Sequence, residues 1–305
     1  MARLQEGGVA SHMLGAELLL MHVLGRDRAW LYAHPEEVLG PGAAARYFEL
    51  VAQRLAGTPT QYLTGRQEFW GLEFEVNPDV LIPRPETEHV VEVALERLGK
   101  DNRSLPLSGA RARIEAARGL RPAPQRSPLR IADVGTGSGC LAVALARELP
   151  EARVLATDIS PAALAVARRN AVRHGVSDRI HFVQCNLLDA FLQGPGVTTH
   201  EPPSLDLIVS NPPYVGRREV GLLPREVREH EPDEALFAGE QGFEVYAPLI
   251  RQAEKLLAAG GVLVLELGYN VLACVRALLD APPWARVGVT NDLAGIPRVI
   301  AAERV

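Results

Sequence analysis

The run Asn211-Pro212-Pro213-Tyr214 holds the groups best suited to bind a planar NH2 group. The side-chain oxygen of Asn211 and the main-chain carbonyl of Pro212 can both accept hydrogen bonds from such a group. The ring of Tyr214 can stack on its flat face. The two prolines fix φ, so these acceptors lose little entropy when a ligand binds. Taken alone, the motif is also compatible with a plain turn.

The motif follows an apolar stretch, residues 205–210, which predicts a buried β-strand. Open α/β sheets bind ligands beyond the carboxyl ends of their strands. The sequence therefore places the four residues at a ligand-binding edge.

A glycine-rich turn lies earlier in the chain, between the apolar runs 129–133 and 141–146. It consists of Gly135, Thr136, Gly137, Ser138 and Gly139. Glycine lets the backbone turn sharply and lets a ligand approach main-chain N–H groups. The spacing is G-x-G-x-G rather than the G-x-G-x-x-G of dinucleotide sites. A loop that only joins a strand to a helix is the alternative.

The next predicted strand, residues 153–157, ends in Asp158, whose carboxylate can accept hydrogen bonds from both hydroxyls of a ribose. Ser160 and Pro161 then suit the N-cap and first position of a helix. The glycine turn, the acidic strand end and the N-P-P-Y strand end, in this order, resemble a class I methyltransferase that uses S-adenosylmethionine. Asp133 either reaches the ammonium group of this cofactor or only caps the turn.

The length, composition and net charge of the chain limit the classes of protein to which it can belong. The 305 residues suffice for one large or two ordinary domains, and 47% of them are hydrophobic, enough for a substantial core. A formal charge of −5 argues against a protein whose main affinity is for nucleic-acid phosphates.

Cys140, Cys185 and Cys274 are widely spaced, and no Cys/His cluster indicates a metal site. We expect reduced thiols in a cytoplasmic protein. No stretch approaches the length of a transmembrane helix, and the N-terminus lacks the pattern of a targeting signal. A monomer is the expected oligomeric state.

Three segments are predicted along the chain. Residues 1–67 have helical periodicity and form a small bundle, which either docks a partner or only stabilises the protein. Residues 68–87 form a β-hairpin and linker, and residues 88–305 a methyltransferase domain. Within this domain, residues 100–127 are rich in Ser, Pro, Gly and Arg. We interpret them as a flexible surface insertion, with a basic nucleic-acid contact as the alternative.

Strands and helices alternate through the last segment. This pattern predicts an α/β fold with a mainly parallel sheet and helices on both faces. The predicted strands are residues 129–133, 153–157, 180–184, 205–210, 262–267, 285–290 and 298–302.

The chain resembles the bacterial release factor glutamine methyltransferases, the HemK/PrmC group, over nearly its whole length. The resemblance rests on the glycine turn, the N-P-P-Y motif and several further stretches. These stretches are residues 16–20, 61–65, 68–72, 81–88, 231–232, 265–268 and 292–295. N-P-P-Y is shared with DNA adenine methyltransferases, whereas the P-R-P-E-T-E stretch at 83–88 and the helical N-terminal domain discriminate between the two families.

The resemblance implies methylation of the side-chain nitrogen of the glutamine in the Gly-Gly-Gln motif of class I peptide chain release factors. It also implies a helical bundle, a β-hairpin linker and a seven-stranded methyltransferase (Rossmann-like) domain whose last strand runs antiparallel. Asn186 and Leu187 stand where the family has an acidic residue and an aromatic residue beside the adenine. We expect both, together with Asn211, to contact the cofactor.

Two alternatives share this chemistry. One is a glutamine methyltransferase of a ribosomal protein, and the other is an adenine methyltransferase of nucleic acid, which would need a basic groove. Glu86 is a candidate neighbour of the site, although a carboxylate favoured by a helix N-terminus is an equal interpretation.

Overall fold

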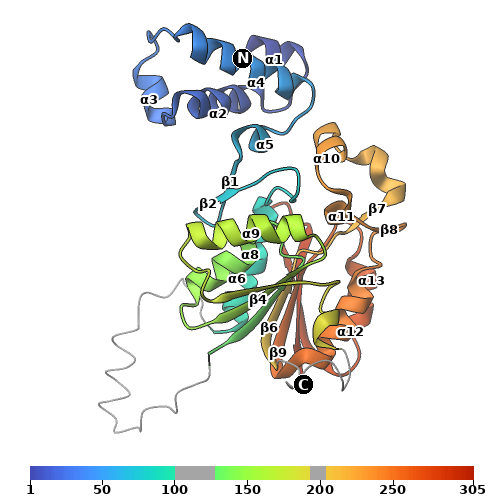
Figure 1. The fold of residues 1–305 in the computed structure, drawn as a ribbon. Helices are drawn as coiled ribbons and strands as arrows, with labels where there is room; N and C mark the ends of the chain where they lie inside the picture. Colours follow the sequence, from blue (N-terminus) through green and yellow to red (C-terminus); the bar gives the residue numbers. More distant parts are fainter. Residues whose placement is uncertain (100–127, 193–203) are drawn as a thin grey trace.

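The computed structural model describes residues 1–99, 128–192 and 204–305. These residues form a helical bundle, a two-stranded hairpin and a larger α/β unit (Figure 1). The expected insertion at 100–127 lies outside the described residues. None of the described helices is both long and apolar enough to span a membrane.

The N-terminal bundle has its own small core. Its helices are α1 (Ala2–Glu6), α2 (His12–Leu24), α3 (Arg28–Ala33), α4 (Pro41–Leu55) and α5 (Thr60–Thr64). Apolar residues spaced three or four apart on α2 and α4 pack against α1. Helix α2 ends at Gly25, whose φ of 62° is a left-handed conformation that glycine adopts without strain.

The hairpin follows directly, with strands β1 (Arg66–Phe69) and β2 (Leu72–Glu75). It begins at Arg66, two residues before the start that the sequence pattern predicts. The reason is local: Gly65 ends α5 with a φ of 72°, and Arg66 already pairs with Glu75. A 3₁₀ turn, η1 (Pro85–Thr87), then leads into helix α6 (Glu88–Arg97).

A seven-stranded sheet forms the centre of the α/β unit, in the order β10-β11-β9-β6-β3-β4-β5. Strand β11 is antiparallel to both of its neighbours, and the remaining pairs are parallel. The expected seven-stranded sheet with an antiparallel last strand is confirmed. The strands are β3 (Arg130–Val134), β4 (Arg153–Asp158), β5 (Ile180–Gln184), β6 (Leu205–Ser210), β9 (Leu257–Glu266), β10 (Trp284–Asn291) and β11 (Pro297–Arg304).

Helices cover both faces of this sheet (Figure 1). Helices α6, α8 (Cys140–Glu148) and α9 (Pro161–Arg173) bury one face, and α12 (Tyr246–Leu256) and α13 (Leu272–Leu279) bury the other. Neighbouring strand residues alternate between the two cores: Ile131 packs under α8, whereas Ala132 packs with α12 and α13. Strands buried on both faces explain the continuous apolar runs in the sequence.

The sequence pattern misses the segment between β6 and α12. Its elements are too short to show a periodicity, and prolines and glycines interrupt the segment. They are β7 (Val215–Gly216), η3 (Arg217–Leu222), α10 (Arg225–His230), α11 (Asp233–Leu236) and β8 (Phe237–Gly239). Strand β9 also starts five residues before the predicted position, because Gly260 and Gly261 lie within it.

Candidate active site

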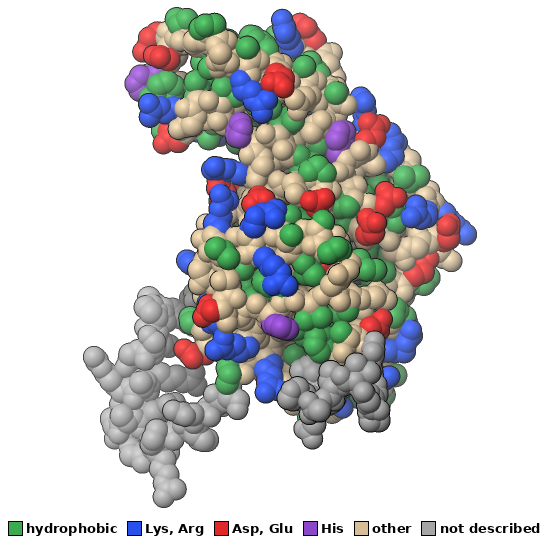
Figure 2. All heavy atoms as spheres, in the orientation of Figure 1, with side chains coloured by type: hydrophobic (Ala, Val, Ile, Leu, Met, Phe, Trp, Pro, Cys, Tyr) green, Lys and Arg blue, Asp and Glu red, His purple; other side chains and the backbone are tan. Residues whose placement is uncertain are grey.

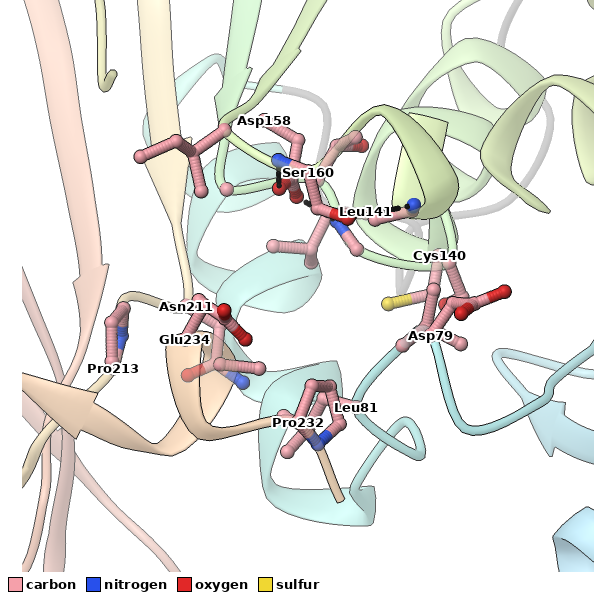
Figure 3. A pocket seen from close by; sticks show the side chains of 18 of the residues that line it. Asp79, Leu81, Cys140, Leu141, Asp158, Ser160, Asn211, Pro213, Pro232 and Glu234 are labelled. Atoms are coloured by element: carbon pink, nitrogen blue, oxygen red, sulfur yellow. Dashed lines mark hydrogen bonds between the residues drawn. The ribbon is translucent and has the colours of Figure 1, made fainter. Parts of the chain in front are cut away.

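A cavity of about 280 Å³ lies where strands β3, β4 and β6 end. This size is near the lower end for ligand pockets, at roughly 300 Å³. Its position is the carboxyl edge of the parallel sheet, as the motifs predict. Figure 3 shows Asp158 and Ser160 above the cavity, with Leu81 and Pro232 below it.

Most of the predicted site residues border this cavity. They are Gly135, Thr136, Gly137, Ser138, Asp158, Asn186, Leu187, Asn211 and Pro213. Among the described residues that we predicted, four do not border it, namely Asp133, Gly139, Pro212 and Tyr214. The structure thus brings the glycine turn, the end of β4 and the first residue of N-P-P-Y to one space.

The three glycines of the turn differ in what surrounds them. All have positive φ, at 72° for Gly135, 53° for Gly137 and 83° for Gly139. A Cβ at either of the first two would meet no atom within 4 Å, so the backbone there lies open to a ligand. A Cβ at Gly139 would lie 3.1 Å from Cβ of Ala167, which shows that this glycine allows α8 and α9 to approach.

Asp158 holds the turn and faces the cavity. One carboxylate oxygen accepts from the N–H of Gly137 and the other from the N–H of Ser160, both at 2.9 Å. Burial raises the pKa of Asp158, and these hydrogen bonds oppose the rise. Ser160 is the N-cap of α9, as predicted, and accepts from the N–H of Ala163 at 3.2 Å.

Asp133 lies behind the turn and is fully buried. One of its oxygens accepts from the Thr136 hydroxyl at 2.6 Å and from the N–H of Ala142 at 3.0 Å. Burial raises the pKa of Asp133 to about 7. These contacts support the alternative in which Asp133 caps the turn. A contact with a cofactor stays a prediction.

Asn211 is the residue of N-P-P-Y that faces the cavity together with Pro213. Its side-chain nitrogen donates a hydrogen bond to the hydroxyl oxygen of Thr87 at 3.0 Å. The nitrogen therefore points toward η1, and the oxygen is left as an acceptor. This is the orientation that a donor NH2 group in the cavity requires.

Tyr214 lies deeper than expected. Its hydroxyl donates to Oε1 of Glu266 at 3.4 Å, and burial raises its pKa. The ring packs closely on Gly268, where a Cβ would lie 2.8 Å from a ring carbon. In this structure the ring therefore supports the turn from behind. Stacking of Tyr214 on a substrate stays a prediction.

Sequence reasoning missed the contribution of Thr87 and Glu266. Glu266, at the end of β9, has 2% of its surface exposed. Burial raises its pKa to about 7; a hydrogen bond from Thr87 opposes the rise, and the charge of Glu86 adds to it. A carboxylate within the apolar run 262–267 is the signal that could have identified it.

Two further walls complete the cavity. Asn186 and Leu187 follow β5, where the family resemblance places the adenine. The missed segment contributes Pro232, Glu234, Ala235 and Phe237. Glu86 does not border the cavity and lies in the first turn of η1, which favours its interpretation as a helix-terminal carboxylate.

The same missed segment touches the helical bundle. Arg54 of α4 pairs with Glu226 of α10 at 2.5 Å, and Arg84 pairs with the buried Glu231 at 2.5 Å. The hydroxyl of Thr58 lies 3.4 Å from Nε2 of His230. The bundle therefore lies next to a segment that also forms part of the cavity wall.

The cavity suits a nucleoside joined to an amino acid. The open glycine backbone offers space, Asp158 offers a carboxylate, and Leu141, Ile159 and Leu187 offer apolar surface. Across residues 1–99, 128–192 and 204–305, no group of three or more His, Cys, Asp or Glu side chains could hold a metal ion.

Comparisons with known proteins agree along the chain. Residues 1–65 match the PrmC N-terminal domain family, and residues 120–223 match the methyltransferase small domain family. The chain is 40% identical over 301 residues to the release factor glutamine methyltransferase of Koribacter versatilis, covering 99% of this chain and 94% of the relative. It is 45% identical to that of Chlorobaculum tepidum over 286 residues, covering 93% and 88%.

A similar solved structure is the hMettl16 catalytic domain in complex with the MAT2A 3'UTR hairpin 6. Its TM-score is 0.55 at 18% identity, and the match covers 83% of this chain and 81% of that one. At this identity the likeness concerns the fold alone.

Proposed function

Because the chain belongs to the family of release factor glutamine methyltransferases, we propose that it methylates the side-chain amide nitrogen of a glutamine in a peptide chain release factor. S-adenosylmethionine is the proposed methyl donor. The proposed target is the glutamine of the Gly-Gly-Gln motif in class I release factors, methylated in the cytoplasm by a monomeric enzyme.

One observation carries the proposal: Asn211 faces the cavity with its amide nitrogen bound to Thr87. A side-chain oxygen fixed as an acceptor matches the NH2 group of a glutamine side chain. The same cavity contains the glycine turn and Asp158, the features suited to the methyl donor. The proposed sites for the methyl donor and for the glutamine would thus share one space at the edge of the sheet.

The residues that would hold the methyl donor follow from the cavity. The glycine turn and Asp158 would bind its amino-acid and ribose parts, and Asn186 and Leu187 would contact its adenine. When bound, S-adenosylmethionine would supply an electrophilic methyl group on a positively charged sulfur, and the carbon–sulfur bond would break to leave a neutral thioether as the methyl transfers.

The chain's own residues would act on the substrate amide. An amide nitrogen is a poor nucleophile because its lone pair is delocalised into the carbonyl. As the nitrogen bonds to methyl it gains positive charge, and its protons become stronger donors. The oxygen of Asn211 would then bind the transition state more tightly than the ground state. The carbonyl of Pro212, which does not border the cavity in this structure, is the proposed second acceptor. The displaced proton can pass to solvent.

The positioning of the reacting atoms would supply the rest of the rate acceleration. Reacting atoms held about 3–3.5 Å apart and in line need no solvent reorganisation before reaction. Pro212 and Pro213 restrict the turn, and the buried Tyr214 supports it from behind. Such a rigid loop would hold the glutamine in line with the methyl group.

The surface is consistent with a protein substrate. Figure 2 shows Lys and Arg side chains interspersed with Asp and Glu on the visible face, rather than gathered into one basic surface. A single basic surface would attract the negatively charged phosphate backbone of a nucleic acid. We propose that the helical bundle docks the release factor, since Met13, Leu14 and Phe48 are about half exposed there.

The direct test uses purified enzyme, labelled S-adenosylmethionine and a class I release factor. Two forms of the factor are compared, the wild type and one in which the glutamine of Gly-Gly-Gln is replaced by alanine. Label on the wild type alone is the expected result. Transfer to ribosomal protein or to nucleic acid, with none to the release factor, would overturn the proposed substrate.

A further inference from the structure

We infer that Thr87 is a positioning residue, which fixes the Asn211 side-chain amide with its oxygen toward the substrate. This inference rests on the proposed function, because it concerns the group that accepts from the glutamine NH2. It assigns a role to a residue of the linker before α6, outside the N-P-P-Y motif.

Thr87 is itself held firmly. Its side chain is buried, with 1% of the residue exposed, and it is the last residue of η1. Its N–H donates to the carbonyl of Arg84 at 3.1 Å, which closes the 3₁₀ turn. The hydroxyl oxygen lies 3.0 Å from the side-chain nitrogen of Asn211. A fixed hydroxyl can therefore select one of the two orientations of the amide.

The hydroxyl proton decides which orientation is selected. A hydroxyl group has a single proton to donate, and an ionised carboxylate can only accept. Against the rise that burial causes, interaction with the Thr87 side chain lowers the pKa of the buried Glu266 carboxyl, which is the direction expected of a hydroxyl that donates to the ionised form. Above the Glu266 pKa of about 7 the carboxylate is ionised and can only accept. When the Thr87 hydroxyl donates its proton there, it can only accept from Asn211, so the NH2 group of the amide must face Thr87.

Glu266 is placed to keep this pattern. Its carboxylate also receives the Tyr214 hydroxyl, at 3.4 Å from Oε1. Its other oxygen is buried and has no hydrogen-bond partner among the described residues, so the carboxylate retains spare capacity as an acceptor. With Glu266 ionised, Asn211 would therefore donate to Thr87, and Thr87 would donate to Glu266.

The consequence concerns catalysis rather than binding of the methyl donor. If the amide of Asn211 turned by half a rotation, its NH2 group would face the NH2 group of the glutamine. Two donors would then oppose each other, and the acceptor needed in the transition state would be missing. Only the fraction of enzyme with the correct orientation could turn over.

The test compares Thr87→Val with Thr87→Ser. Valine keeps the shape and removes the hydroxyl, whereas serine keeps the hydroxyl. We expect kcat for release factor methylation to fall about tenfold in Thr87→Val, the effect of losing one hydrogen bond of ordinary strength. For Thr87→Ser, kcat should stay within about twofold of the wild-type value. Binding of S-adenosylmethionine and KM for the release factor should change little in both.

Thr290→Val is the matched control, because Thr290 lies on β10 at the far edge of the sheet. It should leave kcat unchanged. Two results would overturn the inference: Thr87→Val with the kcat of wild type, or Thr87→Ser as impaired as Thr87→Val. The second would show that keeping the hydroxyl is not sufficient to position the amide.

A double-mutant comparison separates positioning from general damage. If Thr87 acts only through Asn211, then adding Thr87→Val to Asn211→Ala should not lower kcat further. A further tenfold loss in the double variant would overturn the inference. A structural defect would lower both backgrounds equally.

A second variant covers the case in which Thr87→Val does not fold. In Glu266→Gln the carboxamide can donate as well as accept, so the Thr87 hydroxyl is no longer obliged to donate toward β9. We expect kcat to fall with an unchanged dissociation constant for S-adenosylmethionine, and full activity would overturn the inference.

The wild-type enzyme distinguishes failure of the inference from failure of the proposed function. Wild-type enzyme that is inactive on the release factor would overturn the proposed function as well. An active wild type with unaffected variants would overturn the inference alone.

Discussion

The side-chain amide of Asn170 pairs with both main-chain polar groups of Glu75. Its oxygen accepts from the Glu75 N–H at 2.8 Å, and its nitrogen donates to the Glu75 carbonyl at 3.0 Å. The same nitrogen donates to the carbonyl of Ser138 at 2.9 Å. A single side chain of α9, fully buried, thus joins the hairpin to the glycine turn.

Asn170→Ala should destabilise the protein and weaken binding of the methyl donor together. Removing the amide takes a hydrogen-bond partner from three main-chain groups: the N–H and carbonyl of Glu75 and the carbonyl of Ser138. Each buried polar group left unsatisfied costs about 1–3 kcal/mol. We expect the free energy of unfolding to fall by about 3 kcal/mol in urea titrations. Asn291→Ala, at the exposed end of β10, is the control and should change it by less than about 0.5 kcal/mol. Equal stability of the two variants would contradict the linking role of Asn170.

Asn211→Ala should separate chemistry from binding. Loss of one preorganised partner of the transition state typically costs about 100-fold or more in turnover. The dissociation constant for S-adenosylmethionine should stay close to that of wild type, because the glycine turn and Asp158 are untouched. Single-turnover label transfer and calorimetry measure the two quantities. Near-normal turnover would rule out an acceptor role for the amide.

The sequence predicts the sheet well because its strands are long and apolar. Strands β5 and β6 have the predicted bounds, 180–184 and 205–210. Strand β6 is mostly buried and appears as an apolar run, whereas the edge strand β5 alternates buried Ile180 and Phe182 with the exposed His181 and Gln184. The order of the three motifs then predicts one cavity, because carboxyl ends of parallel strands meet at one edge. Short elements such as α10 and β8 have no comparable signal.

Contacts between residues that lie far apart in the sequence cannot be predicted from sequence patterns. The role of Thr87 depends on Asn211 and Glu266, which are far from it in the chain and meet only when η1, β6 and β9 come together. The depth of Tyr214 has the same origin: the ring occupies space that Gly268 leaves at the end of β9. Residue types predict which groups are available, and tertiary packing decides which way they point.

Asp158→Ala should weaken binding of S-adenosylmethionine. The substitution removes the carboxylate proposed for the ribose and also two hydrogen bonds, to the N–H groups of Gly137 and Ser160. We expect the dissociation constant to rise at least tenfold, the equivalent of about 1.4 kcal/mol. Asp280→Ala is the matched control, because Asp280 is exposed and forms only a surface ion pair with Arg276. An unchanged constant in Asp158→Ala would remove Asp158 from the cofactor site.

Stability should depend on pH through Glu266. Burial raises the pKa of Glu266 to about 7, from 4.5 in an exposed glutamate. The unfolded chain therefore releases this proton at a lower pH than the folded protein does. Below about pH 4.5 both states are protonated, and the full contribution to stability is present. As pH rises from there through about 7, the folded state loses about 3 kcal/mol relative to the unfolded state.

Glu266→Gln isolates this contribution, because glutamine does not titrate in the range. Asp133, whose pKa burial also raises to about 7, is present in both proteins and cancels from their difference. We expect the variant to gain stability relative to wild type as pH rises from 4.5 to 8, by about 3 kcal/mol in denaturant titrations. If the difference between the two proteins were the same at pH 4.5 and pH 8, Glu266 would have an ordinary pKa in the folded state. In that case, polar groups other than the Thr87 and Tyr214 hydroxyls would stabilise the ionised carboxylate.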